Sequence, residues 1–550
     1  MTSTTGKTTD PAQARSADRA LVAVLVLVIA LGAALRCEGL ARRPLWYDEV
    51  ATTLHLSGRG EADVRALYDG RPVAADELLR RFQRVGPAPI TRGVAEVVAA
   101  VADDEPQSGP GYFIAAYLWT RSAGDGRAAL RALSALASLI AIPLFGLLAC
   151  RLFGDHQVAL AAMALVAVSP LHLRYAQEAR SYALWTMLLL GSMLALLRAV
   201  ERGSRPAWAI GVVTLAAALY VQPLSLLCLP AIMLLALCSP AHGHDEAERA
   251  ARGTPRVVVV AIVACVAVAV LLWTPWLATI LAHRATLQRT TSWSGETFAG
   301  TALIRGWLGV ATSVFFRPGG AGGLLDAWTS PWSSIAWLIL GIAGVALIAT
   351  ALADLVRRGT PRQRWFVVAL AAVPFATLAL ADLTLGGRRS TVDRYLLPGW
   401  LGLELAVAFC LASPGRLRRV RRAVLLVLLA LGSATILRTR PLDVWWNTDL
   451  TGLAELGSVA ARLQETRSSF VLTDAPPLRM LELAHRLGDG AVVRLGRDGP
   501  AQLAPDEWRR AVLVRPSPAL LEQTRRILGP GRALRPDAAG LPLWRVDATS

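Results

Sequence analysis

Long apolar runs, separated by short loops that contain arginine, dominate this sequence. About eleven of the runs approach the ~20 apolar residues that a helix needs to cross the hydrocarbon core of a bilayer. A soluble chain of 550 residues would form several domains and would distribute its charged residues evenly along them. The pattern therefore predicts a polytopic α-helical membrane protein. The expected spans are residues 21–37, 128–152, 158–172, 182–200, 207–221, 224–238, 257–276, 332–355, 365–383, 395–411 and 423–437.

The arginine content of the loops predicts the orientation. Short cytoplasmic loops of membrane proteins are enriched in basic residues. The loops 151–156, 201–206, 241–256, 357–364 and 416–422 all contain arginine, and all lie on one side if the N-terminus is cytoplasmic. We therefore expect a multi-pass protein of a bacterial plasma membrane, with its N-terminus in the cytoplasm and its C-terminal region outside the cell.

The formal net charge of +17 does not indicate nucleic acid as a partner, because the basic residues lie mainly in these short loops. The 6 cysteines fall in apolar stretches, so neither a disulfide framework nor a cysteine-based metal site is expected. Neither of the common glycine-rich nucleotide-binding motifs occurs in a suitable context. The sequence therefore predicts a lipid bilayer as a partner, no nucleic acid, no metal site and no cofactor, with assistance by a divalent cation left open.

Three segments are expected outside the membrane, on the side opposite the arginine-rich loops. The first, residues 38–127, is too long for a simple connector. It contains amphipathic stretches at 74–82 and 94–101, which we expect to lie along the membrane surface. The second segment is the loop 277–331, and the third is the C-terminal region.

The expected domain organisation follows from these segments. Residues 1–20 are rich in Thr, Ser and Ala and are predicted to form a disordered cytoplasmic tail. Residues 21–438 form the transmembrane domain, including the long first outer loop. Residues 439–550 alternate strand-like and helix-like runs, which predicts a small extracytoplasmic α/β domain.

Two adjacent acids follow the first expected span. Asp48 and Glu49 come directly after Trp46 and Tyr47, an aromatic pair that suits the membrane–water interface. Asp48 would then lie at the depth of the lipid headgroups, where a lipid-linked phosphate also lies. A carboxylate at that depth can accept a proton from an attacking hydroxyl. An ordinary aromatic belt followed by solvated acids is the alternative interpretation.

A second charged cluster fills the outer turn between the third and fourth expected spans. Arg174, Gln177, Glu178 and Arg180 lie within a few residues of one another, just before Tyr182. Two arginines in an outer turn run against the usual preference for cytoplasmic basic residues. Because the arginine fork matches phosphate oxygens, the cluster indicates a phosphate site, with a solvated loop as the alternative.

Together these motifs resemble the GT-C superfamily of integral membrane glycosyltransferases. The resemblance is to the bacterial mannosyltransferase-like branch, which is related to protein O-mannosyltransferases and to lipid A aminoarabinose transferases. It rests on Trp-Tyr-Asp-Glu at 46–49, on Tyr-Ala-Gln-Glu-Ala-Arg-Ser-Tyr-Ala at 175–183, and on Arg-Tyr-Leu-Leu-Pro at 394–398. The layout agrees too, with a long first outer loop and a C-terminal domain outside the membrane.

The resemblance implies inverting transfer of a sugar, with mannose as the family-level expectation, from a polyprenyl-phosphate donor to an unknown extracytoplasmic acceptor. Asp48 would be the general base. Glu178 would orient the substrates or share that role, and Glu49 is a weaker candidate. Arg180 and Arg394 would hold the donor phosphate. The other expected substrate-binding residues are Arg174, Gln177, Tyr112, Tyr182 and Tyr395.

The sequence departs from the family pattern at two places. Relatives often carry a histidine near the end of the first outer loop, where this chain has Gln-Ser-Gly-Pro-Gly-Tyr at 107–112. They also tend to carry one before the proline of the turn that follows the fifth span, where this chain has Tyr-Val-Gln-Pro at 220–223. Both departures put a histidine-dependent substrate contact in doubt. They leave open a relative that binds a glycolipid without catalysis.

Two further interpretations remain open at the level of sequence. A transporter or lipid flippase shares the helix count and could use Glu404, an acid near the middle of the tenth expected span. It does not explain the long first outer loop or the external domain. A polymerase or ligase of the cell envelope with a diphosphate-linked donor would also use arginines, so the sequence separates it poorly from the first interpretation.

Overall fold

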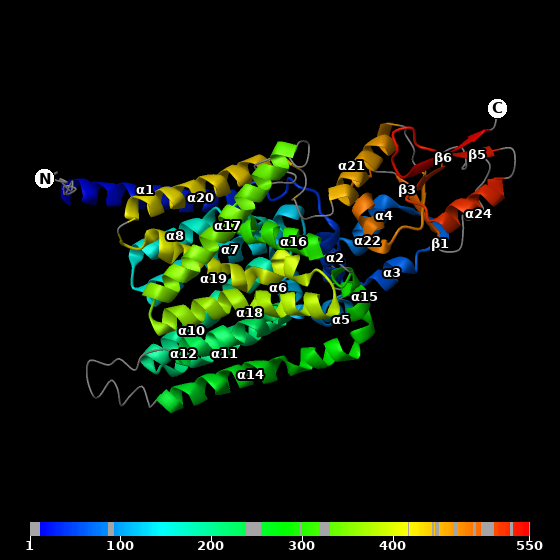
Figure 1. Ribbon diagram of the computed structural model, residues 1–550. Coiled ribbons are helices and arrows are strands. Elements are labelled where there is room, and N and C mark those ends of the chain that lie inside the picture. The colour runs from blue at the N-terminus through cyan, green and yellow to red at the C-terminus, as the bar shows by residue number, and fades with distance from the viewer. Residues whose placement is uncertain are drawn as a thin grey trace.

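The structure is a computed structural model. It describes residues 11–85, 93–237, 255–296, 300–317, 331–415, 417–442, 445, 450–465, 470–487, 491–496, 511–528 and 532–548. Long helices run side by side in one body, and a sheet with its own helices lies at one end of that body (Figure 1). The start of α1 (Pro11–Cys37) lies at the opposite end.

Every expected span is helical. Among the described residues, 8 helices are long and apolar enough to cross a membrane, or 9 if the pair α8 and α9, bent by 61°, forms one span. Two shorter apolar helical segments accompany them. The polytopic prediction is therefore confirmed. The elements are α1, α7 (Arg127–Phe153), α8 (His156–Ala167), α9 (Pro170–Ala176), α10 (Tyr182–Arg202), α11 (Arg205–Val221), η1 (Pro223–Cys228), α12 (Leu229–Leu237), α14 (Pro255–Ala282), α17 (Pro331–Arg358), α18 (Pro361–Leu385), η4 (Asp393–Leu396), α19 (Leu397–Ala412) and α20 (Arg418–Thr439).

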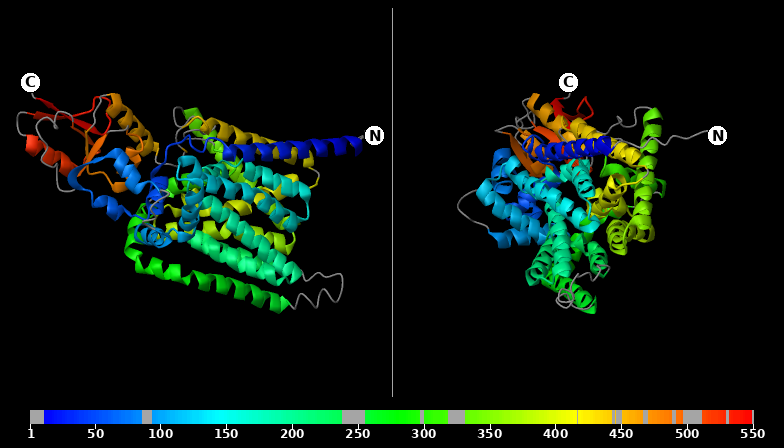
Figure 2. Two further views of the ribbon diagram at one scale, coloured as in Figure 1. Left: turned by 180° about the vertical axis from the view of Figure 1, so that it is seen from behind. Right: turned by 90° about the vertical axis from the view of Figure 1, so that its left-hand side faces the viewer.

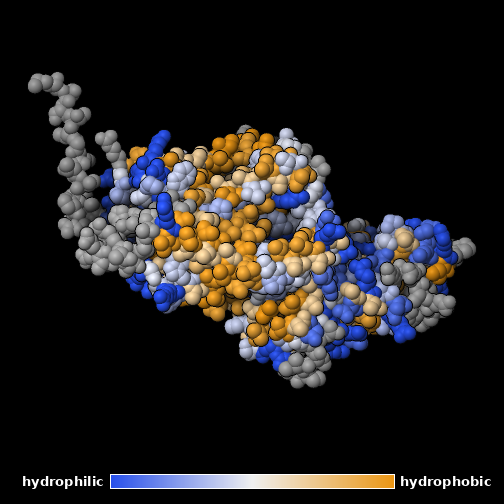
Figure 3. Space-filling model, turned by 90° about the horizontal axis from the view of Figure 1, so that it is seen from below, coloured by the Kyte–Doolittle hydropathy of each residue, from blue (hydrophilic) through white to orange (hydrophobic). Residues whose placement is uncertain are grey.

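The surface of the helical body suits lipid. Apolar side chains cover much of it, whereas polar side chains cover the end that carries the sheet (Figure 3). Several large apolar side chains on this surface are mostly exposed, including Leu27 of α1 at 68% and Val260 of α14 at 67%. An exposed apolar area of this extent marks a surface that is covered by another apolar medium. A bilayer around the helices satisfies that requirement.

The arginine-rich loops meet at one end of the bundle through ion pairs. Glu201 pairs with Arg151 at 2.9 Å and with Arg362 at 3.0 Å, which joins three of the loops. Asp18 of α1 pairs with Arg418 at 2.6 Å. The loop 241–256 lies almost wholly outside the described residues. Four of the five basic loops are thus neighbours, as the orientation prediction requires.

Half of the expected disordered tail is helical. Residues 1–10 lie outside the described part of the chain, but α1 already begins at Pro11. Residues 11–20 are therefore helical, contrary to the prediction. The ion pair of Asp18 with Arg418 helps to explain the difference, because it holds this first part of α1 against α20.

A mixed six-stranded sheet forms the centre of the C-terminal domain, which confirms the predicted α/β fold. The strand order is β1-β3-β2-β4-β6-β5, with β3, β2 and β4 parallel and the remaining neighbours antiparallel. The strands are β1 (Asp69–Ala74), β2 (Phe470–Thr473), β3 (Val492–Gly496), β4 (Ala511–Val514), β5 (Arg532–Pro536) and β6 (Leu543–Ala548). The helices are α21 (Leu450–Glu465), α22 (Pro477–Ala484) and α24 (Pro518–Leu528).

The first outer loop takes part in this domain. Its strand β1 pairs with β3, with Val73 opposite Val493. The following helix, α4 (Ala75–Phe82), packs on α22, and Phe82 shares a hydrophobic core with Leu481. The expectation that residues 74–82 lie along the membrane surface is therefore wrong. The apolar face of this helix is covered by the C-terminal domain, which is far away in the sequence.

The other elements of the outer segments surround the end of the bundle nearest the sheet (Figure 2). These elements belong to the first outer loop, to the second outer loop and to the segment between α18 and α19. Residues 297–299 and 318–330 of the second loop lie outside the described chain. The elements are α2 (Tyr47–Leu56), α3 (Glu61–Arg65), α5 (Val94–Asp104), α6 (Pro110–Ala123), α15 (Arg284–Thr291), η2 (Ser292–Ser294), α16 (Gly300–Ser313) and η3 (Arg389–Thr391).

Candidate active site

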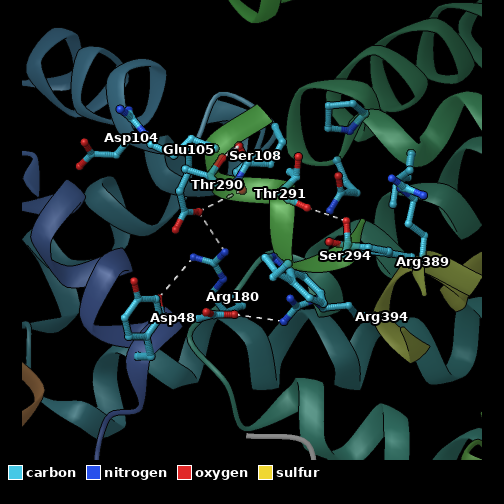
Figure 4. Close-up of a pocket in the computed structure, with 18 of the residues that line it drawn as sticks. Asp48, Asp104, Glu105, Ser108, Arg180, Thr290, Thr291, Ser294, Arg389 and Arg394 are labelled. Atoms are coloured by element: carbon cyan, nitrogen blue, oxygen red, sulfur yellow. Dashed lines mark hydrogen bonds and ion pairs between the residues drawn. The ribbon is translucent and has the colours of Figure 1, made fainter. Parts of the chain in front are cut away.

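A cavity of about 710 Å³ opens where the bundle meets these outer elements. Its walls combine acidic, basic and aromatic side chains from segments that are far apart in the sequence (Figure 4). A cavity of this size can hold a sugar and a phosphate group. The lining residues are Tyr47, Asp48, Glu61, Arg65, Asp104, Glu105, Gln107, Ser108, Arg180, Tyr182, Gln222, Pro223, Leu224, Ile280, Arg289, Thr290, Thr291, Trp293, Ser294, Leu378, Arg389, Arg394, Tyr395 and Leu478.

Asp48 lies in the first turn of α2, at the wall of the cavity. The N-terminus of a helix favours a negative charge, which suits an acid at this position. Arg394 Nη1 donates to Asp48 Oδ2 at 3.2 Å, and 18% of the Asp48 side chain remains exposed. The carboxylate is therefore both paired with an arginine and accessible to a substrate.

Arg180 and Glu105 form the neighbouring ion pair. Arg180 Nη2 lies 3.0 Å from a Glu105 oxygen, and Arg180 Nη1 donates to the backbone oxygen of Asp48 at 3.3 Å (Figure 4). Burial alone would raise the pKa of Glu105, but the charge of Arg180 holds that pKa below its usual range. Burial would likewise lower the pKa of Arg180, yet Glu105 and Asp48 raise it. Both side chains are therefore ionised, and Arg180 remains cationic when a substrate excludes water.

Two more arginines line the same cavity. Arg389 is held by Asp382, whose Oδ1 accepts from both its backbone nitrogen and its Nη1. Arg289 lies on α15. The guanidinium of Arg394 lies 5.3 Å from the ring centre of Trp293, a distance at which cation and ring attract each other. The second outer loop thus adds one arginine and one tryptophan to the site.

Glu49 is absent from the cavity wall, although it is adjacent to Asp48. It is completely buried, and its two oxygens accept hydrogen bonds from Arg131 at 2.7 and 2.6 Å. The backbone nitrogen of Ala179 donates to it at 2.9 Å. Glu49 therefore fastens α2 to α7 and to the turn that carries Arg180, which is a positioning role.

Glu178 is also buried away from the cavity wall. Its Oε1 accepts from Arg174 Nε at 2.7 Å within the same turn. Burial raises the pKa of Glu178 to about 7, against the opposing charge of Arg174. Glu178 and Arg174 are not among the residues that line the cavity, and in this structure they pair with each other.

Gln177 and Tyr112 are both buried behind the cavity wall. Gln177 Nε2 donates to the backbone oxygens of Leu35 and Glu38 at 2.7 and 2.9 Å, so it fixes the end of α1. Tyr112 is only 1% exposed, within the core. The ten predicted site residues thus form two sets. Asp48, Arg180, Tyr182, Arg394 and Tyr395 line the cavity, whereas Glu49, Tyr112, Arg174, Gln177 and Glu178 lie behind it.

The two departures from the family pattern meet at this cavity. Gln107 and Gln222 both line it, and Gln107 Oε1 accepts from Thr290 at 3.1 Å. The start of α6 packs closely against the end of α11. A Cβ on Gly109 would lie 1.7 Å from the backbone oxygen of Tyr220. The changed residues therefore form one continuous part of the wall, which favours an effect on substrate choice.

Glu404 has a different position. It is completely buried inside the bundle, and its Oε2 lies 3.0 Å from His172 Nε2. It is not among the residues that line the cavity. A search of the described residues for three or more His, Cys, Asp or Glu side chains that could hold a metal ion finds none.

Sequence reasoning missed Glu105, Arg289, Trp293 and Arg389. Only Arg389 carried a usable signal, because it belongs to an arginine pair in an outer segment, like the pair that identified the turn before α10. The others reach the site through the packing of the outer loops, which a single sequence does not reveal.

Comparison with known proteins gives one family match. The family described as dolichyl-phosphate-mannose-protein mannosyltransferase matches residues 104–273, which contain Glu105 and Arg180. The chain resembles this family. The match confirms the predicted resemblance to membrane mannosyltransferases over this segment and supports a glycosyltransferase. Asp48 and Arg394 lie outside the matched residues. No curated protein matches the chain.

The solved structures that match the chain include two of ArnT from Cupriavidus metallidurans. The one bound to undecaprenyl phosphate is 12% identical, covers 95% of this chain and 98% of its own, and superposes with a TM-score of 0.49. The structure in the apo state is 15% identical, covers 96% of this chain and 98% of its own, and gives a TM-score of 0.37.

Proposed function

We propose that this protein transfers a sugar from a polyprenyl-phosphate donor to a hydroxyl group of an acceptor outside the cytoplasm, with inversion at the anomeric carbon. The observation that carries the proposal is the accessible Asp48 carboxylate, 3.2 Å from Arg394 and beside Arg180, in one cavity at the end of a membrane bundle. A base next to two fixed cations is the arrangement that this reaction needs.

The reaction follows from these three side chains. Asp48 accepts the proton of the acceptor hydroxyl while that oxygen bonds to the anomeric carbon. The bond between this carbon and the phosphate oxygen breaks, and polyprenyl phosphate leaves with the electron pair. A phosphate is already a good leaving group, so it needs no proton from a general acid. Arg180 and Arg394 stabilise its charge through hydrogen bonds that are in place before the reaction.

The matched family and the arginines support the donor class. The family description names a sugar on dolichyl phosphate, which is a polyprenyl phosphate, and that sugar is mannose. We extend both features to this chain. The apolar bundle next to the cavity suits a donor whose carrier stays in the bilayer.

The orientation and domain division are part of the proposal. The basic loops cluster at the end opposite the cavity, and the positive-inside tendency therefore supports a cavity that opens outside the cytoplasm. Residues 21–438 then form the transmembrane domain and residues 439–550 the extracytoplasmic domain, with β1 and α4 of the first outer loop added to the latter.

The test is sugar transfer by membranes that contain the protein, supplied with a panel of labelled polyprenyl-phosphate sugars. We expect transfer from the mannose-bearing donor, and a fall in kcat by about 10²- to 10⁴-fold for Asp48→Asn. Asp76→Asn, an acid on the outer helix α4, is the matched control and should transfer normally. Equal transfer by Asp48→Asn and wild type, at equal abundance, would contradict the role of Asp48.

A diphosphate-linked donor is the second candidate, favoured by one observation. Arg65, Arg289 and Arg389 line the cavity in addition to Arg180 and Arg394, and a diphosphate offers more negative charge to such a set than the single phosphodiester of a monophosphate-linked sugar. Adding polyprenyl-diphosphate sugars to the same panel distinguishes the two. Transfer only from the diphosphate donors would replace the first proposal by this one.

A further inference from the structure

The helix that carries Asp48 belongs to the hydrophobic core of the C-terminal domain. Val50 and Leu54 of α2 are completely buried, in the same cluster as Leu481 of α22 and Val493 of β3. Figure 1 shows α2 between the bundle and α22. The position of the proposed base is therefore set by the C-terminal domain as well as by the bundle.

Hydrogen bonds reinforce this packing. Gln83, which follows α4, donates from Nε2 to the backbone oxygen of Val50 at 3.1 Å. Its Oε1 accepts from Thr53 of α2 and lies 2.9 Å from Nε2 of His485, directly after α22. Gln83 thus connects α2 to the end of α22. On the other side of α2, Glu49 binds Arg131 of the bundle, so α2 is held from both directions.

One residue of α22 lines the cavity, and the next contacts a residue of the cavity wall. Leu478 lines the cavity together with Tyr47 and Asp48. The guanidinium of Arg479 lies 4.8 Å from the ring centre of Tyr47, and Arg479 is fixed by an ion pair with the buried Glu482 at 2.8 Å. A cation at this distance from an aromatic ring attracts it. The C-terminal domain therefore supplies part of the cavity wall beside the proposed base.

The direction of attack in the proposed reaction indicates that the part of the wall formed by α22 faces the acceptor. In an inverting transfer the acceptor approaches the anomeric carbon from the face opposite the leaving group. Arg180 and Arg394 mark the phosphate position, and Asp48 must contact the acceptor hydroxyl. The wall that adjoins Asp48 without contributing to the phosphate position therefore faces the acceptor.

We infer that α22 of the C-terminal domain forms the acceptor side of the active site, with Leu478 as a specificity-determining residue and Arg479 as a positioning residue that acts through Tyr47. This inference rests on the proposed function. The C-terminal domain would then both select the acceptor and hold the helix that carries Asp48.

The test separates the kinetics of the two substrates in the full-length protein. Transfer from polyprenyl-phosphate mannose is measured with octyl mannoside and with a threonine-containing peptide as acceptor probes. We expect Leu478→Ala to raise the acceptor KM by about ten-fold, while the donor KM changes by less than about two-fold. Leu478→Trp should change the preference between the two acceptor probes.

Matched variants separate a local effect from loss of folding. Leu520→Ala removes a buried side chain of α24, which belongs to a separate hydrophobic cluster of the C-terminal domain and does not line the cavity. It should lower thermal stability and leave the acceptor KM unchanged. Arg479→Gln should lower kcat, and Arg479→Lys, which keeps a cation over Tyr47, should restore most of it.

The outcomes distinguish the two proposals. Absence of transfer by wild type with every donor and acceptor of the panel would contradict the proposed function, and this inference with it. Transfer by wild type, together with equal changes of donor and acceptor KM in Leu478→Ala, or no change in either, would overturn only the assignment of α22. The same holds if Leu520→Ala alters the acceptor KM as strongly as Leu478→Ala.

Discussion

Asp48 and Glu49 are consecutive residues of one helix, yet only the Asp48 carboxylate reaches the cavity, while that of Glu49 is enclosed with Arg131. Successive side chains of an α-helix point about 100° apart, so two adjacent acids cannot face the same site equally. Asp48 is therefore the proposed base, and Glu49 attaches the helix to the bundle.

The buried pair gives the first prediction. Glu49→Ala leaves Arg131 charged and without its carboxylate in a closed interior, so we expect a loss of about 3–5 kcal/mol in unfolding free energy. Thermal unfolding in detergent measures it. The double variant Glu49→Leu with Arg131→Met should recover most of the stability, because no uncompensated charge remains. A single variant as stable as wild type would show that the pair does not hold α2.

The second prediction concerns pH and Glu178. Its pKa is raised from an ordinary value of 4.5 to about 7 by burial, so the folded protein keeps a proton there that the unfolded chain has already lost. Stability is then fully present below pH 4.5 and falls as the pH rises to about 7, by about 3 kcal/mol at most. Glu178→Gln should flatten this part of the stability profile.

Unfolding of both proteins at about pH 5 and about pH 8 measures the difference. Glu77→Gln, at an exposed position of α4, is the control and should keep the slope of wild type. A slope that survives in Glu178→Gln would assign the titration to another group.

The third prediction tests whether Arg394 itself, and not the overall positive charge of the protein, determines the donor KM. We expect Arg394→Gln to raise the donor KM by about ten-fold or more, because one of the two arginines at the phosphate position is lost. Arg394→Lys keeps the charge but not the fork, and should give an intermediate value. Arg526→Gln, on the exposed face of α24, should match wild type. An unchanged donor KM in Arg394→Gln would remove this residue from the phosphate site.

The fourth prediction concerns the close contact of the first outer loop with the turn after α11. Gly109→Ala would place a Cβ 1.7 Å from the backbone oxygen of Tyr220, so α6 must move away from α11. We expect a loss of about 1–3 kcal/mol in stability, together with altered substrate KM values, because Gln107 and Gln222 would separate. At Gly126 a Cβ would meet nothing within 4 Å, so Gly126→Ala is the control. Equal stability of the two variants would contradict the packing.

The sequence predicted the span pattern because apolar length is a property of each segment alone. It also predicted Asp48, Arg180 and Arg394, whose local motifs carry their own signal. Glu105 and Trp293 escaped prediction because their place in the cavity depends on contacts between distant loops. Strand β1 escaped for the same reason, since its partner lies near the other end of the chain.

Residues of one short motif also differ in whether they line the cavity. Gln177, Glu178 and Arg180 lie within four residues, but only Arg180 lines the cavity. Gln177 donates instead to the backbone oxygen of Leu35, and Glu178 accepts from the side chain of Arg174. A short motif rich in polar residues therefore marks the place of a site more reliably than it marks which side chain touches the substrate.

The pairing of β1 with β3 has a consequence for biosynthesis. The ribosome delivers β1 early, with the first outer loop, and its partner strand only after all the membrane spans have been made. Throughout this interval β1 lacks the strand with which it pairs, and α2 lacks the core against which its apolar face packs. The site around Asp48 is thus completed last, so a nascent or truncated chain inserted in the bilayer would not yet be an active enzyme.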